Sequence, residues 1–321
     1  MKNNILILFK HIIVYFFVLF VIVSIIFFVI NSLIEPQIKK NIAVYSQINS
    51  SPWIRYGEFL NNLFSFRGGK IYSKELAATN LSIITLYFMQ FKWTILFTVI
   101  IFIFSLIIGN LLGIWSAYKF NKAPDFVVNI IVSALATIPL IVLAILALGT
   151  SIFLGYPSQF INNGSLTFTS IITPIIITAF GTISLFHARS RKITKETLSS
   201  NYYLFSISLG NSKTKLFKQN IIKNLIIAEL QVILPFYILL FSTSLIIERI
   251  FSIPGQSIFI SYVFTKAELN CIMFYFSFNF FALLIARFIN EIILNYLNPA
   301  QAIEKRIRWI KRKRLDYEWT R

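Results

Sequence analysis

The hydrophobic residues of this chain are gathered into long runs that contain no charged side chain. A helix that crosses the hydrocarbon core of a bilayer needs about 20 mostly apolar residues. The longest run, 126–188, exceeds the length of one helix, and the Gly, Pro, Asn and Ser residues of 154–165 divide it in two. We therefore predict an all-α, polytopic membrane protein with six transmembrane helices at about 12–34, 93–118, 126–150, 168–188, 230–247 and 269–286.

The first of these runs resembles a signal peptide only in the lysines that precede it. It is too long for the apolar region of a signal peptide and no small-residue cleavage site follows, so we interpret it as a retained anchor helix. The last run is predicted to continue as helix to Leu297. Pro139 and Pro174 are predicted to kink or loosen the third and fourth spans. Gly109 and Gly113 share one helix face and are predicted to allow close helix packing within the subunit.

The basic residues are distributed unevenly between the two sides of the membrane. With six spans, 20 of the 30 Lys and Arg residues fall on the side of the N-terminus and nine on the other side. The larger group lies in 1–11, 119–122, 189–224 and 298–321, and the smaller group in 35–92 and 248–268. Positive charge in short loops marks the cytoplasmic face. We therefore expect both termini to be cytoplasmic.

The composition supports the membrane assignment and restricts the meaning of the net charge. Of the 321 residues, 57% are hydrophobic and 13% are charged, about half the charge density of a soluble domain. The formal net charge of +18 would suggest nucleic acid only if the basic residues covered a soluble face. Since most of this surface would face lipid, no nucleic-acid partner is predicted. The basic cluster at 305–314 is predicted to contact anionic membrane lipids.

The sequence offers few residues for catalysis or for metal binding. Cys271 is the single cysteine, and the two histidines, His11 and His187, are far apart in the sequence. The fragment 210–214 contains a Lys-Thr pair but lacks the glycine pattern of a phosphate-binding loop. We therefore predict no catalytic residues, no metal site, no cofactor and no ATPase site in this chain.

Ionisable residues are also missing from the middle of every predicted span. Such residues mark proton relays and ion sites, because their burial in a membrane is costly. Glu229, Arg287 and Glu291 come nearest, all close to the proposed cytoplasmic ends, and the last two are spaced as an i,i+4 pair. A transporter driven by protons or sodium is therefore disfavoured, and we expect any energy source to lie on another chain.

The segment 189–224 is the longest connection predicted on the cytoplasmic side. It begins with a basic cluster at 189–192, continues through Asn201-Tyr202 to Gly210, and re-enters the membrane after Lys223-Asn224. A membrane protein without its own motor that presents such a loop is placed to receive force from a partner ATPase.

Here the chain resembles a known family, the integral-membrane permease subunits of ABC importers for dipeptides, oligopeptides and nickel or metal-chelate ligands. Asn201-Tyr202, Gly210 and Lys223-Asn224 match the family's Asp-Tyr pair, its glycine and its Arg-Asn pair at the expected spacing. The segment 247–255 resembles the V-E-x-x-F-x-x-P-G motif, and 297–299 resembles the closing L-(N/D)-P. Jointly these motifs are specific, and the resemblance covers about residues 50–300.

The resemblance implies a type-I ABC importer permease fold, with residues 197–215 as the cytoplasmic coupling helix and its flanks. The implied ATPase-coupling residues are Asn201, Tyr202, Phe205, Ser206, Gly210, Lys213, Lys215, Lys223 and Asn224. The implied outer-gate residues are Glu248, Phe251, Pro254 and Gly255, on a re-entrant or surface segment, with a plain Pro-Gly turn as the alternative. The implied partners are a second permease, two ATP-binding subunits and an extracytoplasmic solute-binding protein.

The resemblance also implies an organisation along the chain and a bacterial cytoplasmic-membrane location. Residues 1–92 would hold the anchor helix and an extracytoplasmic segment, 93–299 the transmembrane domain, and 300–321 a basic cytoplasmic tail. Leu204 and Phe205 stand where the family has small residues, and Ala228 stands where it has a proline. The sequence does not distinguish peptides from nickel or metal chelates as the solute. A non-transporting structural or regulatory membrane subunit is the alternative function.

Overall fold

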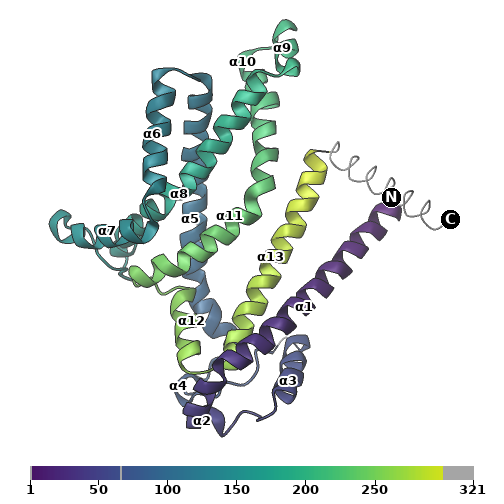
Figure 1. Cartoon of the computed structure of the whole chain (residues 1–321), viewed down its shortest axis with the longest axis vertical. Helices are drawn as coiled ribbons and strands as arrows, with labels where there is room; N and C mark the ends of the chain where they lie inside the picture. Colours follow the sequence, from purple (N-terminus) through teal and green to yellow (C-terminus); the bar gives the residue numbers. More distant parts are fainter. Residues whose placement is uncertain (1, 66, 299–321) are drawn as a thin grey trace. The chain divides into compact units, whose positions relative to one another are not determined.

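A computed structural model describes residues 2–65 and 67–298 of this chain, and the predicted basic tail lies outside them. The side chains of residues 2–12 are likewise outside the description. The described residues form helices and connecting segments without a strand (Figure 1). In chain order the elements are α1 (Lys2–Lys40), α2 (Ile42–Tyr45), α3 (Pro52–Phe64), α4 (Lys74–Ala77), α5 (Ile83–Tyr118), α6 (Ala123–Thr137), α7 (Leu140–Leu154), α8 (Ser165–Leu198), α9 (Asn201–Ser208), α10 (Lys213–Leu216), the π-helix η1 (Phe217–Ile222), α11 (Lys223–Ile250), α12 (Gln256–Thr265) and α13 (Leu269–Leu297).

The predicted spans are present as long apolar helices. In the described part of the chain, five helical segments are long and apolar enough to cross a membrane, and the bent pair α6–α7 makes a sixth if it is counted as one span. The all-α prediction and the continuation of the last helix to Leu297 are therefore confirmed. The helices extend beyond the apolar runs that predicted them, because backbone hydrogen bonding continues where the side chains become polar.

The third span differs from its prediction. Instead of one kinked helix over 126–150, α6 ends at Thr137, α7 begins at Leu140, and the two helices meet at 88°. Pro139 lies at the break, and Ile138 before it has an extended backbone, the conformation that a following proline favours. Pro174 lies inside α8, which the structure shows as one helix.

The segment 189–224, predicted as a cytoplasmic connection with a coupling helix and its flanks at 197–215, is mostly helical. The helix α8 continues to Leu198, and the short helices α9 and α10 connect it to α11 (Figure 1). Together α10, η1 and α11 form a 38-residue helical run over Lys213–Ile250. The helix therefore begins before Asn224, in polar turns that carry no apolar run, and membrane re-entry after Asn224 stays a prediction.

The chain divides into two compact units. Within the described residues, the first unit comprises 2–65, 67–100, 141–177 and 241–284, and the second comprises 101–140, 178–240 and 285–298. The first unit has a core of aliphatic and aromatic side chains from α1, α3, α5, α12 and α13. Within it Tyr87 is fully buried and stacks on Phe91 with ring centroids 4.9 Å apart. Aromatic contacts of this kind add to the stabilisation from burial.

Buried polar groups fix the connecting segments of the first unit. The guanidinium of Arg55 in α3 donates to Asn31 (2.9 Å) and Glu35 (2.7 Å) of α1. The carboxylate of Glu268 accepts the backbone N–H groups of Tyr72 and Ser73, which joins the 66–82 segment to the start of α13. Burial raises the pKa of the Glu268 carboxyl, although the two N–H donors oppose the shift.

Close packing of α5 on α8 in the second unit depends on the two predicted glycines. A Cβ atom on Gly109 would lie 2.9 Å from the carbonyl oxygen of Ile183, and one on Gly113 would lie 2.7 Å from that of His187. Neither distance leaves room for a side chain, so the predicted packing of these glycines within the subunit is confirmed.

Candidate functional site

The candidate coupling site is the helix α9 together with the residues that hold it at the end of α8 and the start of α11. Tyr203 is the buried anchor of α9 and packs with Leu216 and Ile221. The other large apolar side chains of this segment are exposed, with 51% exposure for Tyr202 and 64% for Phe205. We call the side that carries Tyr202, Phe205 and Leu209, spaced i, i+3 and i+7, the α9 apolar face. Exposed apolar groups gathered in this way mark interaction surfaces.

Asn224 connects the three helices of the coupling site. Its side-chain amide donates to the hydroxyl of Tyr202 in α9 and to Thr197 Oγ1 in α8, the latter at 3.3 Å. Tyr202 and Asn224 are 22 positions apart in the sequence. Their hydrogen bond therefore brings together the motifs Asn201-Tyr202 and Lys223-Asn224. The structure brings these predicted residues together, and their part in coupling stays a prediction.

The turn after α9 depends on Gly210. Gly210 has a φ of +74°, a left-handed conformation that glycine adopts at little cost. Asn211 reinforces the turn by donating its amide to the carbonyl oxygen (3.0 Å) and the hydroxyl (2.9 Å) of Ser206. Ser212 then caps α10 by accepting the N–H of Lys215 at 3.4 Å.

The basic residues predicted at this site are exposed. Lys213, Lys215 and Lys223 all present their side chains to the surface near the α9 apolar face. An apolar patch with cationic neighbours suits a partner surface that has an apolar cleft and an acidic rim. It equally suits the headgroup side of a membrane surface.

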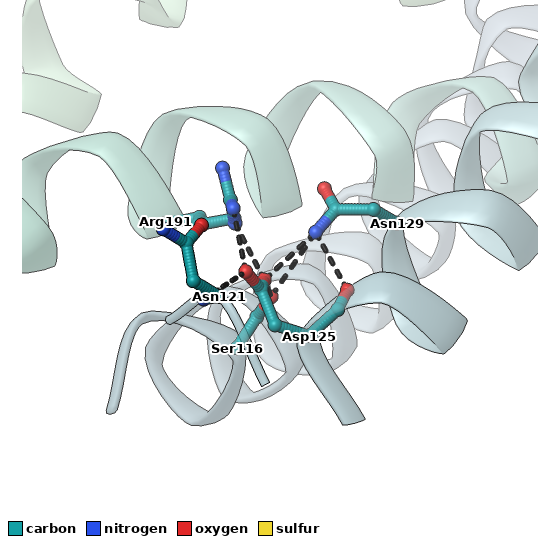
Figure 2. A network of polar contacts seen from close by, with 5 residues as sticks. All are labelled: Ser116, Asn121, Asp125, Asn129 and Arg191. Atoms are coloured by element: carbon teal, nitrogen blue, oxygen red, sulfur yellow. Dashed lines mark hydrogen bonds and ion pairs between the residues drawn. The ribbon is translucent and has the colours of Figure 1, made fainter. Parts of the chain in front are cut away.

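A buried ion-pair network, which sequence reasoning did not identify as a site, holds the α5–α6 turn against α8. Figure 2 shows Arg191 of α8 directed at Asp125 of α6, with Ser116, Asn121 and Asn129 around the carboxylate. The pair is bidentate, since Arg191 Nε and Nη2 each lie 2.7 Å from an Asp125 oxygen. Asn129 donates to Asp125 Oδ1 at 2.8 Å, and the backbone N–H of Asn121 donates to Oδ2 at 3.1 Å.

This network satisfies a carboxylate that is only 2% exposed. The Arg191 guanidinium also lies 4.9 Å from the ring centroid of Phe120, a cation–π distance. Asp125 and Arg191 are 66 positions apart. Their pairing left no periodic pattern in the sequence, where Arg191 was visible only as part of the basic cluster at 189–192.

Replacing Asp125 by asparagine is expected to lower the free energy of unfolding by about 3 kcal/mol, because Arg191 loses its counter-ion in a largely buried site. Thermal unfolding of the purified protein in lipid nanodiscs measures this change. Glu196→Gln is the matched control, since Glu196 is an exposed acidic residue of the same helix as Arg191. A loss no larger than that of the control would contradict a stabilising role for the pair.

The predicted outer-gate residues form a second polar network, in the first unit. Glu248 is fully buried and accepts Thr94 Oγ1 at 2.6 Å and the backbone N–H of Ser257 at 2.9 Å. Thr94 Oγ1 in turn accepts the N–H of Gln256 at 2.9 Å. Glu248 thereby satisfies the first turn of α12, where unpaired N–H groups and the helix dipole favour a negative charge.

The rest of this segment is buried as well. Phe251 is fully buried, and Pro254-Gly255 leads directly into α12. The segment is therefore mostly buried within the first unit, with the carboxylate of Glu248 against Gly255. Its position relative to the membrane, re-entrant or at the surface, stays a prediction. A role of these residues in gating stays a prediction.

Within residues 2–65 and 67–298, no three His, Cys, Asp or Glu side chains come together as a metal site. Cys271, the one cysteine in the sequence, is buried in the first unit.

Comparisons with known proteins agree with the resemblance drawn from the motifs. The family described as "Binding-protein-dependent transport system inner membrane component" matches residues 109–303. An oligopeptide transport system permease protein of Mycoplasma pneumoniae is 26% identical over 272 residues, which cover 80% of this chain and 69% of that protein. A dipeptide transport system permease protein of Lactococcus lactis is 26% identical over 204 residues, which cover 63% of this chain and 65% of that protein.

Proposed function

This chain belongs to the family of binding-protein-dependent transport system inner membrane components, and we propose that it forms part of the translocation path of an ABC importer for peptides. It is a transport subunit of the bacterial cytoplasmic membrane and, as a member of this family, not an enzyme. Two similar proteins are named for oligopeptide and dipeptide transport. These names favour peptides over nickel or metal chelates as the solute.

The observation that carries the proposal is the α9 apolar face. Tyr203 and Asn224 fix α9 at the junction of α8 and α11, while Tyr202 and Phe205 remain exposed. A rigidly held helix with exposed aromatic side chains fits a helix-in-groove docking mode. We propose that the ATP-binding subunits supply this groove, so that their closure moves α8 and α11 through α9.

The proposed complex contains a second permease, two ATP-binding subunits and an extracytoplasmic solute-binding protein. In this arrangement α9 is cytoplasmic, consistent with the eight basic residues of 189–224. Both termini then face the cytoplasm as well. The segment 35–92 faces outward, where the solute-binding protein docks.

The direct test is reconstitution of the complex in liposomes with ATP inside and its solute-binding protein outside. We expect ATP-dependent accumulation of a labelled tripeptide and none of a nickel chelate. Nickel uptake without peptide uptake would contradict the proposed solute. A stable complex that transports neither would instead favour the structural or regulatory alternative.

Replacing Gly210 by valine is expected to reduce uptake at least about tenfold while ATP hydrolysis continues. A β-branched residue is strained at a φ of +74°, so the turn that fixes the end of α9 would shift. Uptake and phosphate release are measured in the same liposomes. Gly210→Asn is the control, because asparagine tolerates left-handed angles, and normal uptake by the valine variant would contradict a role of this turn in coupling.

A further inference from the structure

A cavity of about 630 Å³ lies within the second unit, between α5, α8, η1 and α11. Its wall consists of aliphatic and phenylalanine side chains such as Phe102, Ile114 and Phe236. Asn110 and Glu229 are the two polar residues in this lining. Ligand sites commonly have this volume and combine an apolar wall with a few polar groups that orient the ligand.

Three acceptor oxygens of the cavity wall have no hydrogen-bond partner in the described part of the chain. Both carboxylate oxygens of Glu229 and the Oδ1 atom of Asn110 are buried without a hydrogen-bond partner there. Burying a charged carboxylate without a partner costs desolvation free energy, about as much as a whole ion pair can return. Such groups are therefore rare in proteins, or they are protonated.

Other buried carboxylates in the chain differ from Glu229 in this respect. Asp125 is paired with Arg191, Glu248 accepts from Thr94 and Ser257, and Glu268 accepts from two backbone N–H groups. Each of these three buried carboxylates therefore has a hydrogen-bond or ion-pair partner within the fold. Glu229 has one basic neighbour that could have paired with its carboxylate, but the hydrogen bonds of that neighbour go to other groups.

That neighbour is Arg189 of α8. Its Nε and Nη2 atoms both donate to the carbonyl oxygen of Ala228, at 2.9 Å for Nε, and Nη2 lies 3.4 Å from Gln231 Oε1. The guanidinium thus binds the backbone of α11 one residue before Glu229. This arrangement leaves the Glu229 carboxylate available to a donor that comes from outside the chain.

We propose that this cavity receives the ammonium group of the transported solute, with Glu229 as its counter-ion and Asn110 as a second acceptor. The inference rests on the proposed function, because it assigns a solute-binding step to the same permease. A free peptide amino terminus has a pKa of about 8 and is therefore mostly cationic at neutral pH. The apolar wall would contact the uncharged part of the solute, and a carboxylate beside an unpaired amide oxygen selects a cation over an anion.

The test measures binding to the complete importer in nanodiscs of phosphatidylcholine and phosphatidylglycerol, without the solute-binding protein. The probes are trialanine amide, which carries one ammonium group, and N-acetyl-trialanine amide, which carries none. We expect the wild-type complex to bind the first at least about tenfold more tightly, the size of one charge-assisted hydrogen bond. Glu229→Gln is expected to remove this preference.

Two further variants separate recognition from folding. Glu229→Asp keeps the charge and is expected to keep the preference, and Glu196→Gln removes an exposed acid outside the cavity and is expected to keep it as well. Equal binding of both probes by the wild type would overturn the proposal. An undiminished preference in Glu229→Gln would overturn it too.

The lipid amine is the other source of an ammonium group, and a separate arm tests it. If nanodiscs with phosphatidylethanolamine abolish binding of trialanine amide to the wild type, the lipid occupies the site and the assignment to the solute is wrong. Peptide uptake in liposomes is measured independently. Its absence would contradict the proposed function, whereas the two dissociation constants still decide whether Glu229 holds an ammonium group.

Discussion

Replacing Phe205 by glutamate is expected to lower the affinity of the permease for its ATP-binding subunits at least about tenfold and to stop uptake. Phe205 is 64% exposed on the α9 apolar face, so the change should leave the fold of the permease intact. In the proposed complex the same side chain is buried in a groove, where aromatic residues carry a large share of binding energy and an unpaired charge is strongly disfavoured.

The affinity is measured by titrating detergent-solubilised permease with the purified ATP-binding subunits. Ser199→Glu is the matched control, since it adds the same charge at an exposed position between α8 and α9. The control is expected to bind within about twofold of the wild type, as rim charges contribute little. Equal affinities for the wild type and Phe205→Glu would mean that α9 does not dock the ATP-binding subunits.

The spans could be predicted from sequence because a membrane requires a long apolar run. That requirement sets where a helix can cross but not where it ends. The last turns of α8, up to Leu198, and the first turns of the run from Lys213 are polar and helical. Nothing in a hydrophobic pattern separates such turns from a loop, so the pattern marked 189–224 only as a connection, and the helix expected within 197–215 came from the family resemblance.

Three of the prolines inside or between spans show a second limit of sequence reasoning. Pro139 separates two helices at 88°, whereas Pro174 and Pro235 lie inside α8 and α11. A proline removes one backbone hydrogen bond and restricts the preceding residue. Whether the helix then kinks or ends depends on what neighbouring helices supply, which the local sequence does not contain.

Site residues could be predicted where a short motif fixes them and could not where two distant residues meet. The motifs placed Tyr202 and Asn224 in one loop, and the structure shows that they are hydrogen-bonded. The pairing of Asp125 with Arg191 required the approach of α6 to α8. That the Glu229 carboxylate lacks a hydrogen-bond partner can be seen only in the folded chain, where the position of each neighbouring donor is known.

Replacing Gly255 by alanine is expected to lower the free energy of unfolding by about 3 kcal/mol and to impair uptake. The backbone angles of Gly255 are ordinary, with a φ of −94°, so the effect does not arise from backbone strain. It arises from space, because a Cβ atom would lie 2.7 Å from Glu248 Oε1 and closer still to the rest of the carboxylate. The carboxylate would have to leave Thr94 and the first turn of α12.

A second substitution identifies the cause of that loss. Gly149→Ala is the control in the same unit, where a Cβ atom meets nothing within 4 Å, and it should be neutral or slightly stabilising in a helix. In the background of Glu248→Ala the clash is absent, so adding Gly255→Ala should cost less than about 1 kcal/mol further. Thermal unfolding of the four variants of this cycle measures the coupling between the two residues. Strict additivity of the two losses would show that Gly255 is required for a reason other than its contact with Glu248.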